Sequence, residues 1–588
     1  MTARDCDLLV IGSGAAGLSA AATAASLGLD VIVAERAGQL GGTTAWSGGW
    51  MWLPRNRHAR DAGITEDIAE PRRYLAAVLG SRFDAARVDA FLAAAPEAVD
   101  FLEAEGMHFE PGNRICDVYA DQPGAGTGGR QLIAAPLDAR RLGPRLALLR
   151  ETKRETAFAG MPIQAGADLA AFLTATRKPA SALHAARRVL RHGWDMLRHG
   201  RALQLVNGVA LVARLFEIAD RHGTRWLTGT EATALTGSRQ HVTGAVLRGP
   251  DGEFTVTARH GVLLATGGFS RAPEFTSGLF PHAAEHLSLA VPEADGAALR
   301  LALPFGARFD TAVAAAGAWC PVSALRWPDG QAGVFPHIID RAKPGVIAVR
   351  ADGRRFVNEA NGYHDYVSAL LAATPEGEPP RSWLVCDHRF IRRWGLGAVK
   401  PFPVPMGWWL RSGYLKRADS LAALARLCGI TPELERTVAA FNAAAREGRD
   451  PEFDRGWSPY NRHGGDPALP NPNLAPIERG PFYAVEVVPG SFGSFAGLAT
   501  DGAARVLGED GAVIGGLFAA GADAASVMGG FYPSGGINLG PALTFGFIAA
   551  REAAHEQQSD LSAPLADNPD SGESVQAGGG DVCRKDKN

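Results

Sequence analysis

A cluster of glycines close to the N-terminus has the spacing that a phosphate-binding turn needs. Gly12, Gly14 and Gly17 form a GxGxxG pattern between the apolar run CDLLVI and an Ala/Leu-rich stretch. The first glycine permits a tight turn, the second lets a pyrophosphate approach the backbone, and the third allows a helix to pack closely on a strand. Glu35 follows Gly17 by 18 residues, where its carboxylate can accept hydrogen bonds from a ribose. These residues predict a dinucleotide site.

Two more glycine-rich segments indicate which dinucleotide is bound. GGTTAWSGG (41–49) follows shortly after the first site, and GLFAAGAD (516–523) lies towards the C-terminus. FAD is long enough to need such extra loops, whereas NAD rarely uses them, so we expect FAD. Arg36, beside Glu35, either contacts the ribose or adenine or faces solvent. The residues expected to bind FAD are Gly12, Gly14, Ala15, Ala16, Gly17, Glu35, Arg36, Gly41, Gly42, Thr43, Thr44, Ser47, Gly48, Gly49, Ala232, Thr266, Gly267, Gly521, Asp523, Asn538 and Leu539.

The segments around the first glycine cluster have the order expected of a doubly wound α/β fold. Residues 6–12 and the run DVIVAE, which ends at Glu35, are short and apolar, as buried strands are. Residues 15–28 between them are rich in Ala and Leu and end at Gly28, which is typical of a helix. Strand, glycine turn, helix and strand in this order predict a Rossmann-like domain.

Strand and turn patterns return near the C-terminus, which indicates that the domain is discontinuous. We expect a glutathione reductase-type FAD-binding domain built from residues 1–283 and 475–556, with a mostly helical excursion at 55–230. An α+β catalytic domain at 284–474 interrupts it. The tail at 557–588 is polar and rich in Asp, Ser and Gly, and is expected to be disordered.

Composition excludes several classes of protein. The 588 residues include 59 Lys and Arg against 62 Asp and Glu, a balance that provides no field for attracting nucleic acid. The six cysteines form no CxxC pair, which argues against a zinc site, an iron–sulfur cluster or a disulfide framework, and favours a cytoplasmic location. The HxxEH run at 282–286 would need a third ligand and a helix framework to bind zinc, and it follows Pro281 at an expected domain junction, so we expect no metal.

Three further motifs add a resemblance to a known group of enzymes. GGTTAWSGGWMWLP (41–54), GRRFVNEANGY (353–363) and GADAASVMGGFYPSGGINLGPALTFGFIAAR (521–551) accompany the GxGxxG pattern. Together they resemble the fumarate reductase/succinate dehydrogenase flavoprotein superfamily and, within it, the 3-ketosteroid dehydrogenases. The resemblance covers about residues 1–555 and is loosest at 55–230. Many members attach FAD through a histidine after the first βαβ unit. Since 41–49 contains none, we expect non-covalent FAD.

The resemblance implies a chemistry and assigns residues to it. These enzymes remove two vicinal hydrogens next to a ring ketone: a tyrosinate takes the α-proton and the flavin accepts the β-hydrogen as hydride. Tyr363 matches the base, Tyr532 and the Gly536 N–H match the pair that binds the carbonyl oxygen, and Tyr119 matches a tyrosine that assists the base. Ser534 departs from the 1-dehydrogenases and is similar to the 4-ene-forming enzymes, so both 1,2- and 4,5-desaturation stay open.

Two rival interpretations remain, and Tyr366 is a second candidate for the base. A fumarate-type enoate reductase would need cationic clamps for a carboxylate, for which Arg341, Lys343, Arg354 and Arg355 are candidates. A flavin-binding relative without catalytic activity is the other.

The resemblance also implies the partners of the protein. The expected partners are a small lipophilic ketone and an electron acceptor that no motif identifies; no motif indicates the oligomeric state. The basic amphipathic stretch 187–201 indicates either a peripheral membrane contact or a solvated helix face.

Overall fold

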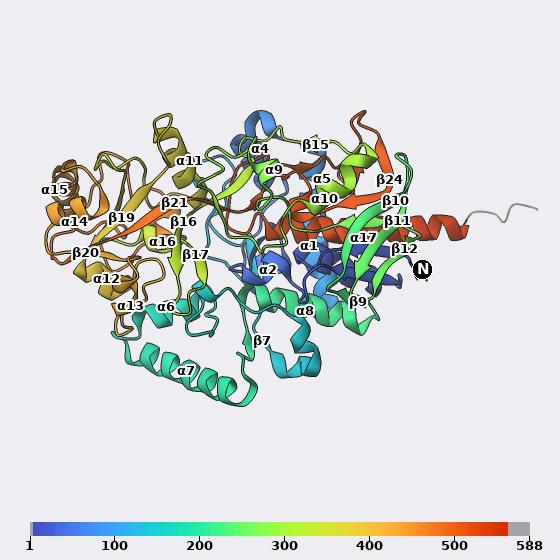
Figure 1. Ribbon diagram of the computed structural model, residues 1–588, viewed down its shortest axis with the longest axis horizontal. Helices are drawn as coiled ribbons and strands as arrows, with labels where there is room; N and C mark the ends of the chain where they lie inside the picture. The colour runs from blue at the N-terminus through green and yellow to red at the C-terminus, as the bar shows by residue number, and fades with distance from the viewer. Residues whose placement is uncertain (1–3, 563–588) are drawn as a thin grey trace, which may run out of the picture.

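The protein, seen here as a computed structural model, is described for residues 4–562, with side chains over 5–555. Its nucleotide-binding part contains a six-stranded sheet, at the right of Figure 1. All neighbouring strands of this sheet are parallel except the β23–β24 pair. The strand order is β23 (Arg505–Leu507), β24 (Val513–Ala519), β13 (Val262–Leu264), β2 (Leu8–Ile11), β3 (Val31–Glu35) and β9 (Arg225–Thr228).

Helices and a second sheet cover this core. The alanine-rich helix α1 (Ala15–Ser26) buries 11 of its 12 residues and packs against α8 (Asn207–Arg221) and α17 (Leu539–Ser562). Small side chains permit this close approach: a Cβ on Gly546 of α17 would lie 2.3 Å from the Ala16 carbonyl oxygen. A four-stranded sheet joins β1 (Arg4–Cys6), β12 (Gly252–Ala258), β11 (Val242–Gly249) and β10 (Glu231–Gly237). The predicted α/β, Rossmann-like fold class is confirmed.

The predicted first strand is divided in two. Asp7 separates β1 from β2, and its carboxylate accepts hydrogen bonds from the Asp30 N–H (2.7 Å) and the Arg259 side chain (2.7 Å). β1 pairs with β12, whereas β2 pairs with β3 and β13. One apolar run therefore contributes to two sheets, which periodicity alone does not indicate.

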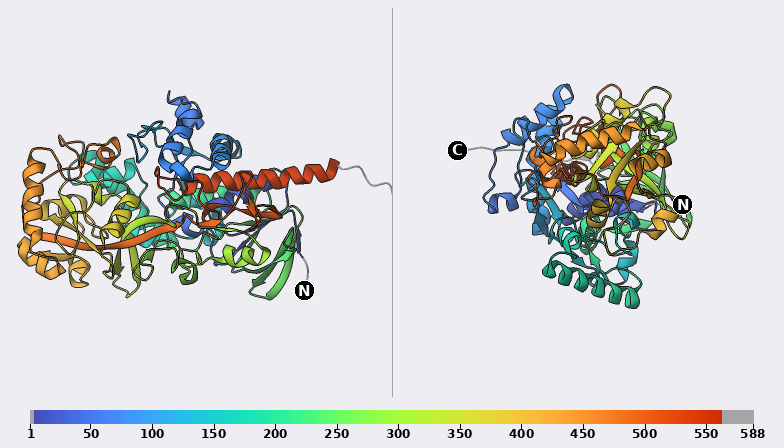
Figure 2. Two further views of the ribbon diagram at one scale, coloured as in Figure 1. Left: turned by 90° about the horizontal axis from the view of Figure 1, so that it is seen from above. Right: turned by 90° about the vertical axis from the view of Figure 1, so that its left-hand side faces the viewer.

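A seven-stranded sheet forms the other half of the molecule. Its path is β17 (Ala332–Pro336), β16 (Gly317–Arg326), β21 (Phe482–Ser494), β19 (Ser382–Asp387) and β18 (Val346–Val349), and β14 (Leu287–Ser288) and β20 (Lys416–Ala418) also pair with β21. The 13-residue strand β21 runs from this sheet towards the nucleotide-binding part (Figure 2). Residues 482–494 thus pair with strands from 287–418, although the sequence suggested that they belong to the nucleotide-binding segment.

The excursion at 55–230 is partly helical. It contains α4 (Ala69–Leu79), α5 (Ala85–Ala104), α6 (Ala167–Thr174) and α7 (Pro179–His199), and also β5 (Phe109–Pro111) and β6 (Gln131–Ala134), which form a sheet with β4 (Trp50–Trp52). At the C-terminus α17 continues to Ser562, so 557–562 are helical rather than disordered. The rest of the predicted tail, 563–588, lies outside the described residues. No helix within 4–562 has the length and apolar character needed to cross a bilayer.

Candidate functional site

One cavity of about 1800 Å³ extends from the nucleotide-binding sheet to the seven-stranded sheet. Its volume exceeds the roughly 300–1,000 Å³ typical of a pocket for one small ligand. The GxGxxG turn and residues from the segments 42–50 and 520–545 line one part of it. Residues 335–343, 394–404 and 460–467 line the other part, and residues from 152–189 form a cover. The cavity therefore has room for a dinucleotide and a second ligand.

The GxGxxG turn has the backbone that a pyrophosphate requires. Gly12 has φ +105°, and a Cβ there would lie 2.2 Å from the Ala265 carbonyl oxygen. A Cβ on Gly17 would lie 2.0 Å from the Gly12 carbonyl oxygen, so this glycine permits helix–strand contact without lining the cavity. Gly14, Ala15 and Ala16 do line it, at the N-terminus of α1. These residues fit a dinucleotide with its phosphates at the helix N-terminus.

Glu35 lines the cavity and is oriented by its neighbours. Its carboxylate accepts hydrogen bonds from the Ser13 N–H (3.1 Å), the Ser13 hydroxyl (2.5 Å) and the Ala37 N–H (2.9 Å). Arg36 also lines the cavity, and it forms an ion pair with Asp295 at 2.8 Å. Arg36 is therefore on the cavity wall, where Asp295 balances its charge. Ser13 was not predicted, although its position inside the GSG turn could have indicated it.

The second glycine-rich loop contributes both backbone and hydroxyl groups. Gly42, Thr43, Thr44, Ser47, Gly48 and Gly49 all line the cavity. Thr44 Oγ1 accepts a hydrogen bond from the Ala15 N–H (2.9 Å), which ties the loop to the N-terminus of α1. Gly41 is not on the cavity wall; it turns the chain with φ +116°, and a Cβ there would touch Val212 at 3.1 Å.

The C-terminal Gly–Asp segment supports the site from behind. Gly521, Thr266, Gly267, Ala232, Asn538 and Leu539 line the cavity, whereas Asp523 is buried outside it. The Asp523 carboxylate accepts hydrogen bonds from the N–H groups of Thr266 and Gly268, the latter at 2.8 Å. Burial raises the pKa of Asp523 to about 6, although these donors act in the opposite direction. The structure places Asp523 as a brace of the loop 266–268 and not on the cavity wall.

Two tyrosines meet where the two parts of the cavity join. Tyr363 begins α11 (Tyr363–Ala373), and Tyr532 lies in the turn before α17. Their rings are in edge contact, with centroids 4.7 Å apart. Burial raises the pKa of both phenols above the usual range. The Tyr532 hydroxyl oxygen accepts a hydrogen bond from Asn538 Nδ2 (3.0 Å), so its own hydrogen can be donated elsewhere.

Gly536 supplies a second donor close to Tyr532. It lines the cavity with φ +95°, and a Cβ there would lie 2.7 Å from the Met51 carbonyl carbon. Its carbonyl oxygen accepts from the N–H groups of Trp52 (3.1 Å) and Gly540 (2.9 Å), which hold the turn in place. Its own N–H has no acceptor among the residues described. A phenol and an amide are therefore both available to one ligand oxygen.

Three predicted candidates lie off the cavity wall. Ser534 is fully buried and does not line the cavity, and its hydroxyl accepts a hydrogen bond from Gln131 Nε2 (2.7 Å). The Tyr119 hydroxyl donates to Asp365 Oδ1 at 2.7 Å, two residues from Tyr363 in α11, and so reaches the base only through another residue. Tyr366, the second candidate base, bonds Ser382 at 2.9 Å within the core. The structure therefore does not bring these three to a ligand.

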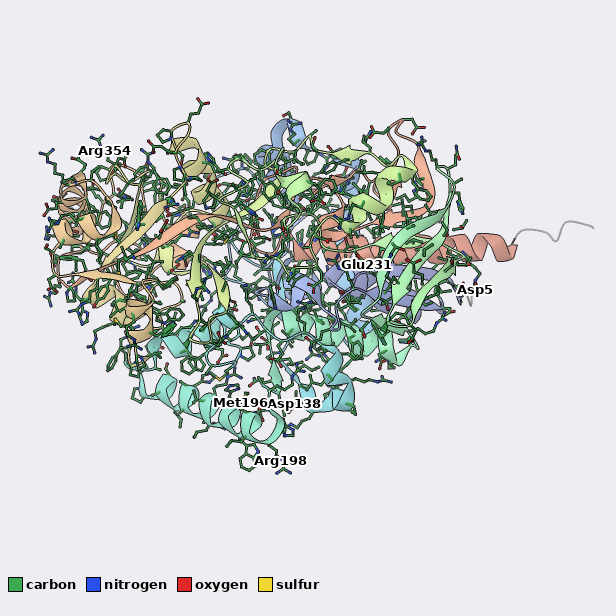
Figure 3. All side chains as sticks on the ribbon, in the orientation of Figure 1. Asp5, Asp138, Met196, Arg198, Glu231 and Arg354 are labelled. Atoms are coloured by element: carbon green, nitrogen blue, oxygen red, sulfur yellow. The ribbon has the colours of Figure 1, made fainter. Side chains whose placement is uncertain are left out.

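The cations required by the enoate reductase hypothesis are mostly engaged elsewhere. Arg354 lies at the outer edge of the molecule (Figure 3), and Arg355 is buried in ion pairs with Glu359 and Asp450, each at 2.8 Å. Arg341 lines the cavity, but its side chain donates to the His337 and Glu359 carbonyls, both at 2.7 Å. Lys343 also lines the cavity, and it makes one hydrogen bond, to the Gly465 carbonyl at 3.1 Å.

The cover of the cavity has an unusual outer face. Phe172, Leu173 and Val189 of α6 and α7 line the cavity. The other face of α7, at the lower edge of Figures 1 and 3, exposes Leu190 by 74% and Leu197 by 87% beside the arginines of 187–201. An exposed apolar and basic face is consistent with a peripheral membrane contact, which stays a prediction.

Comparison with known proteins agrees with this geometry. Residues 7–539 match the family model described as FAD binding domain. The chain is 40% identical over 557 residues to 4-oxocyclohex-2-ene-1-carboxylate 5-dehydrogenase of Sinomonas cyclohexanicum, covering 93% of this chain and 94% of that protein. It is 34% identical to 3-oxosteroid 1-dehydrogenase of Mycolicibacterium smegmatis, with 94% and 98% covered.

A solved structure has a similar fold. The crystal structure of 3-ketosteroid Δ1-dehydrogenase from Sterolibacterium denitrificans in complex with 1,4-androstadiene-3,17-dione superimposes with a TM-score of 0.87 at 33% identity. The match covers 94% of this chain and all of that one. The resemblance inferred from the motifs is thereby confirmed over nearly the whole chain.

Proposed function

The chain belongs to the FAD-binding domain family and is an FAD-dependent dehydrogenase acting on CH–CH groups, and from this premise we propose that it desaturates a cyclic ketone next to its carbonyl group. The observation that supports this most is the pair of buried phenols beside the Gly536 N–H. These groups are suited to a neutral carbonyl oxygen, because two hydrogen-bond donors converge where negative charge would develop.

Tyr532 and Gly536 hold the ketone oxygen. The Tyr532 hydroxyl accepts from Asn538 (3.0 Å), which orients it and leaves its hydrogen for the ligand. As the α-proton is removed, the oxygen gains negative charge and both hydrogen bonds strengthen. Each such donor contributes about 2.7–4 kcal/mol to the stability of the transition state.

Tyr363 removes the α-proton as its phenolate. It touches both Tyr532 and Phe492, with ring centroids 4.7 Å and 5.3 Å away, so its ring has a fixed orientation. When bound, FAD supplies the two-electron acceptor for the β-hydrogen, and the C=C bond forms between the two carbons. Tyr119 is a positioning residue, since its hydroxyl contacts Asp365 rather than the cavity.

We further propose that FAD is held without a covalent bond. His463 is the one histidine lining the cavity within the described chain, and it lies on the part opposite the GxGxxG turn. Denaturation of the purified yellow protein should therefore release all of its flavin into the supernatant, whereas flavin that stays with the precipitate contradicts this.

Anaerobic titration of the holoenzyme tests the proposed reaction. We would add a saturated 3-ketosteroid, a monounsaturated one and 4-oxocyclohexanecarboxylate in turn, follow flavin absorbance and identify the product, which also distinguishes 1,2- from 4,5-desaturation. A cyclic ketone should bleach the flavin and yield the conjugated enone. Bound FAD that none of these ketones can bleach would support the non-catalytic alternative, and viologen-linked reduction of fumarate would support the enoate reductase.

A further inference from the structure

The part of the cavity beyond the phenols contains two lysines without a carboxylate partner. Lys343 follows the 3-10 turn η5 (Asp340–Ala342), and Lys400 follows the hairpin that begins at Gly395. Both line the cavity and are half-buried. No carboxylate in the described chain lies within 4.0 Å of either ammonium group.

Each ammonium group has N–H donors that no hydrogen bond within the described chain uses. Lys343 Nζ donates to the Gly465 carbonyl (3.1 Å) and lies 5.0 Å from the centre of the Trp394 ring. Lys400 Nζ donates only to the Glu155 carbonyl, at 3.5 Å. A lysine ammonium has three N–H donors, so most of theirs are unused. Lys153, which lines the same cavity, differs because it pairs with Glu155 at 3.4 Å.

Acidic groups do not balance these charges. Between residues 330 and 470 the only carboxylate on the cavity wall is Asp340, and it already accepts from His337 (2.7 Å) and the Gly397 N–H (2.9 Å). Arg462 adds a cationic group at the more exposed rim. A cleft lined by one sign of charge attracts ligands of the other sign.

The lysines are rigidly connected to the phenols. Arg341, within η5, donates to the carbonyls of Glu359 (2.7 Å) and Asn361 (3.3 Å), in the turn that leads into Tyr363. The same Asp340 carboxylate that receives the Gly397 N–H anchors the hairpin of Lys400 to η5. The ketone donors and the two lysines therefore line one cavity, and hydrogen bonds connect η5 to the turn before Tyr363 and to the hairpin of Lys400.

We infer that Lys343 and Lys400 bind a carboxylate carried by the ketone substrate, so that the enzyme acts on a cyclic oxo acid. This rests on the proposed function for the position of the ketone, and it adds the second point of attachment. Burial lowers the pKa of each lysine to about 8, which weakens the ammonium form. A carboxylate bound beside them would favour the ammonium form and so raise the pKa again.

The pH dependence of binding follows from these groups. Asp466 favours the charged form of Lys343, and Arg393 opposes it. Lys343 in turn lowers the pKa of His463, and Asp340 favours the charged form of Lys400. Since the ammonium form binds the anion, affinity for a carboxylate should fall as pH rises above about 8. Affinity for a neutral ester should not change over that range.

The test separates binding from catalysis. Calorimetry on the holoenzyme would use cyclohexanecarboxylate, which lacks the ketone, and cyclohexanecarboxamide as its neutral match. Lys343→Gln and Lys400→Gln should each weaken carboxylate binding about tenfold, as expected for loss of one charge-assisted contact, and leave amide binding within about twofold. The matched control is Lys416→Gln in β20, a lysine away from the cavity, which should change neither.

Turnover provides the second arm. With 4-oxocyclohexanecarboxylate the two variants should raise KM about tenfold with little change in kcat, whereas KM for its methyl ester should stay within about twofold. Equal losses for acid and ester, or no loss in either variant, would overturn the inference. If the acids bind as expected but no ketone bleaches the flavin, the proposed function fails while the carboxylate site stands.

Discussion

The two parts of the cavity differ in which atoms form their walls. Around the GxGxxG turn the wall is mainly backbone, held at separations that exclude a Cβ at Gly12 and Gly17. Around Tyr363 and Lys343 the wall consists of side chains that several distant segments bring together. Substitutions should therefore have different consequences: in the first part they should release FAD, and in the second they should slow turnover of an enzyme that retains FAD.

The largest expected effect is that of Tyr363→Phe. Loss of the general base should slow flavin reduction by a cyclic ketone about 10²–10⁴-fold at unchanged FAD content, measured by anaerobic stopped flow. Tyr366→Phe is the matched control, because Tyr366 bonds Ser382 in the core and should keep its rate within about twofold. A full rate in Tyr363→Phe would remove the base from the proposal.

Tyr532→Phe should follow closely. Removal of one donor to the ketone oxygen should lower the rate about 10²–10³-fold, again without loss of FAD. Tyr119→Phe removes a contact to Asp365 and not to the ligand, so its loss should be several-fold smaller. If the two variants lose the same activity, Tyr532 has no direct contact with the ketone.

The pH dependence of flavin reduction tests the role of Tyr363. Burial raises the pKa of Tyr363 well above its usual value, so at neutral pH only a small fraction is phenolate. The phenolate is the active form, and its fraction rises as pH rises, so flavin reduction by a neutral ketone should accelerate about tenfold per pH unit. A rate independent of pH between 7 and 10 would argue against a phenolate base.

Asp523→Asn should act on the cofactor instead. An amide group would oppose the N–H donors of Thr266 and Gly268, leaving at least one of them without an acceptor. Such a loss costs about 1–3 kcal/mol, so FAD affinity should fall about tenfold or more, as measured by flavin fluorescence on titration of the apoprotein. The rate of the FAD-saturated variant should change little.

The pH dependence of apoprotein stability provides a second test of Asp523. Its pKa in the folded protein is about 6 and its usual value is 3.8. Because the folded value is raised, the stability that protonation contributes is present below 3.8 and is lost as pH rises through 6. Apoprotein stability should decline over that interval in the wild type but not in Asp523→Asn.

Ser534→Ala should have the smallest effect. The buried hydroxyl accepts from Gln131 but is not itself on the cavity wall, so the rate should stay within about twofold while stability falls by about 1–3 kcal/mol. Thermal unfolding and steady-state kinetics measure the two quantities separately. A large fall in rate at unchanged stability would return Ser534 to the catalytic residues.

The difference between the two parts also explains what the sequence could predict. Gly12, Gly14 and Glu35 lie within one βαβ unit, so a local pattern was sufficient for the nucleotide site and the fold class. Ser534 could not be placed, because the side of a turn that a residue faces depends on packing rather than on neighbours in sequence. Lys343 and Lys400 belong to no motif, and their unpaired state depends on where distant carboxylates lie.

Strand β21 sets the geometry between the two parts. Its C-terminal residues place Phe492 against the ring of Tyr363 and Ser494 against the Phe269 N–H (3.3 Å), next to the loop that Asp523 braces. Its earlier residues pair with β19 and β20, in the sheet farthest from the nucleotide. Because Phe492 and Ser494 are separated by a single residue of one paired strand, the distance between Tyr363 and the loop 266–269 is fixed by a few consecutive peptide units.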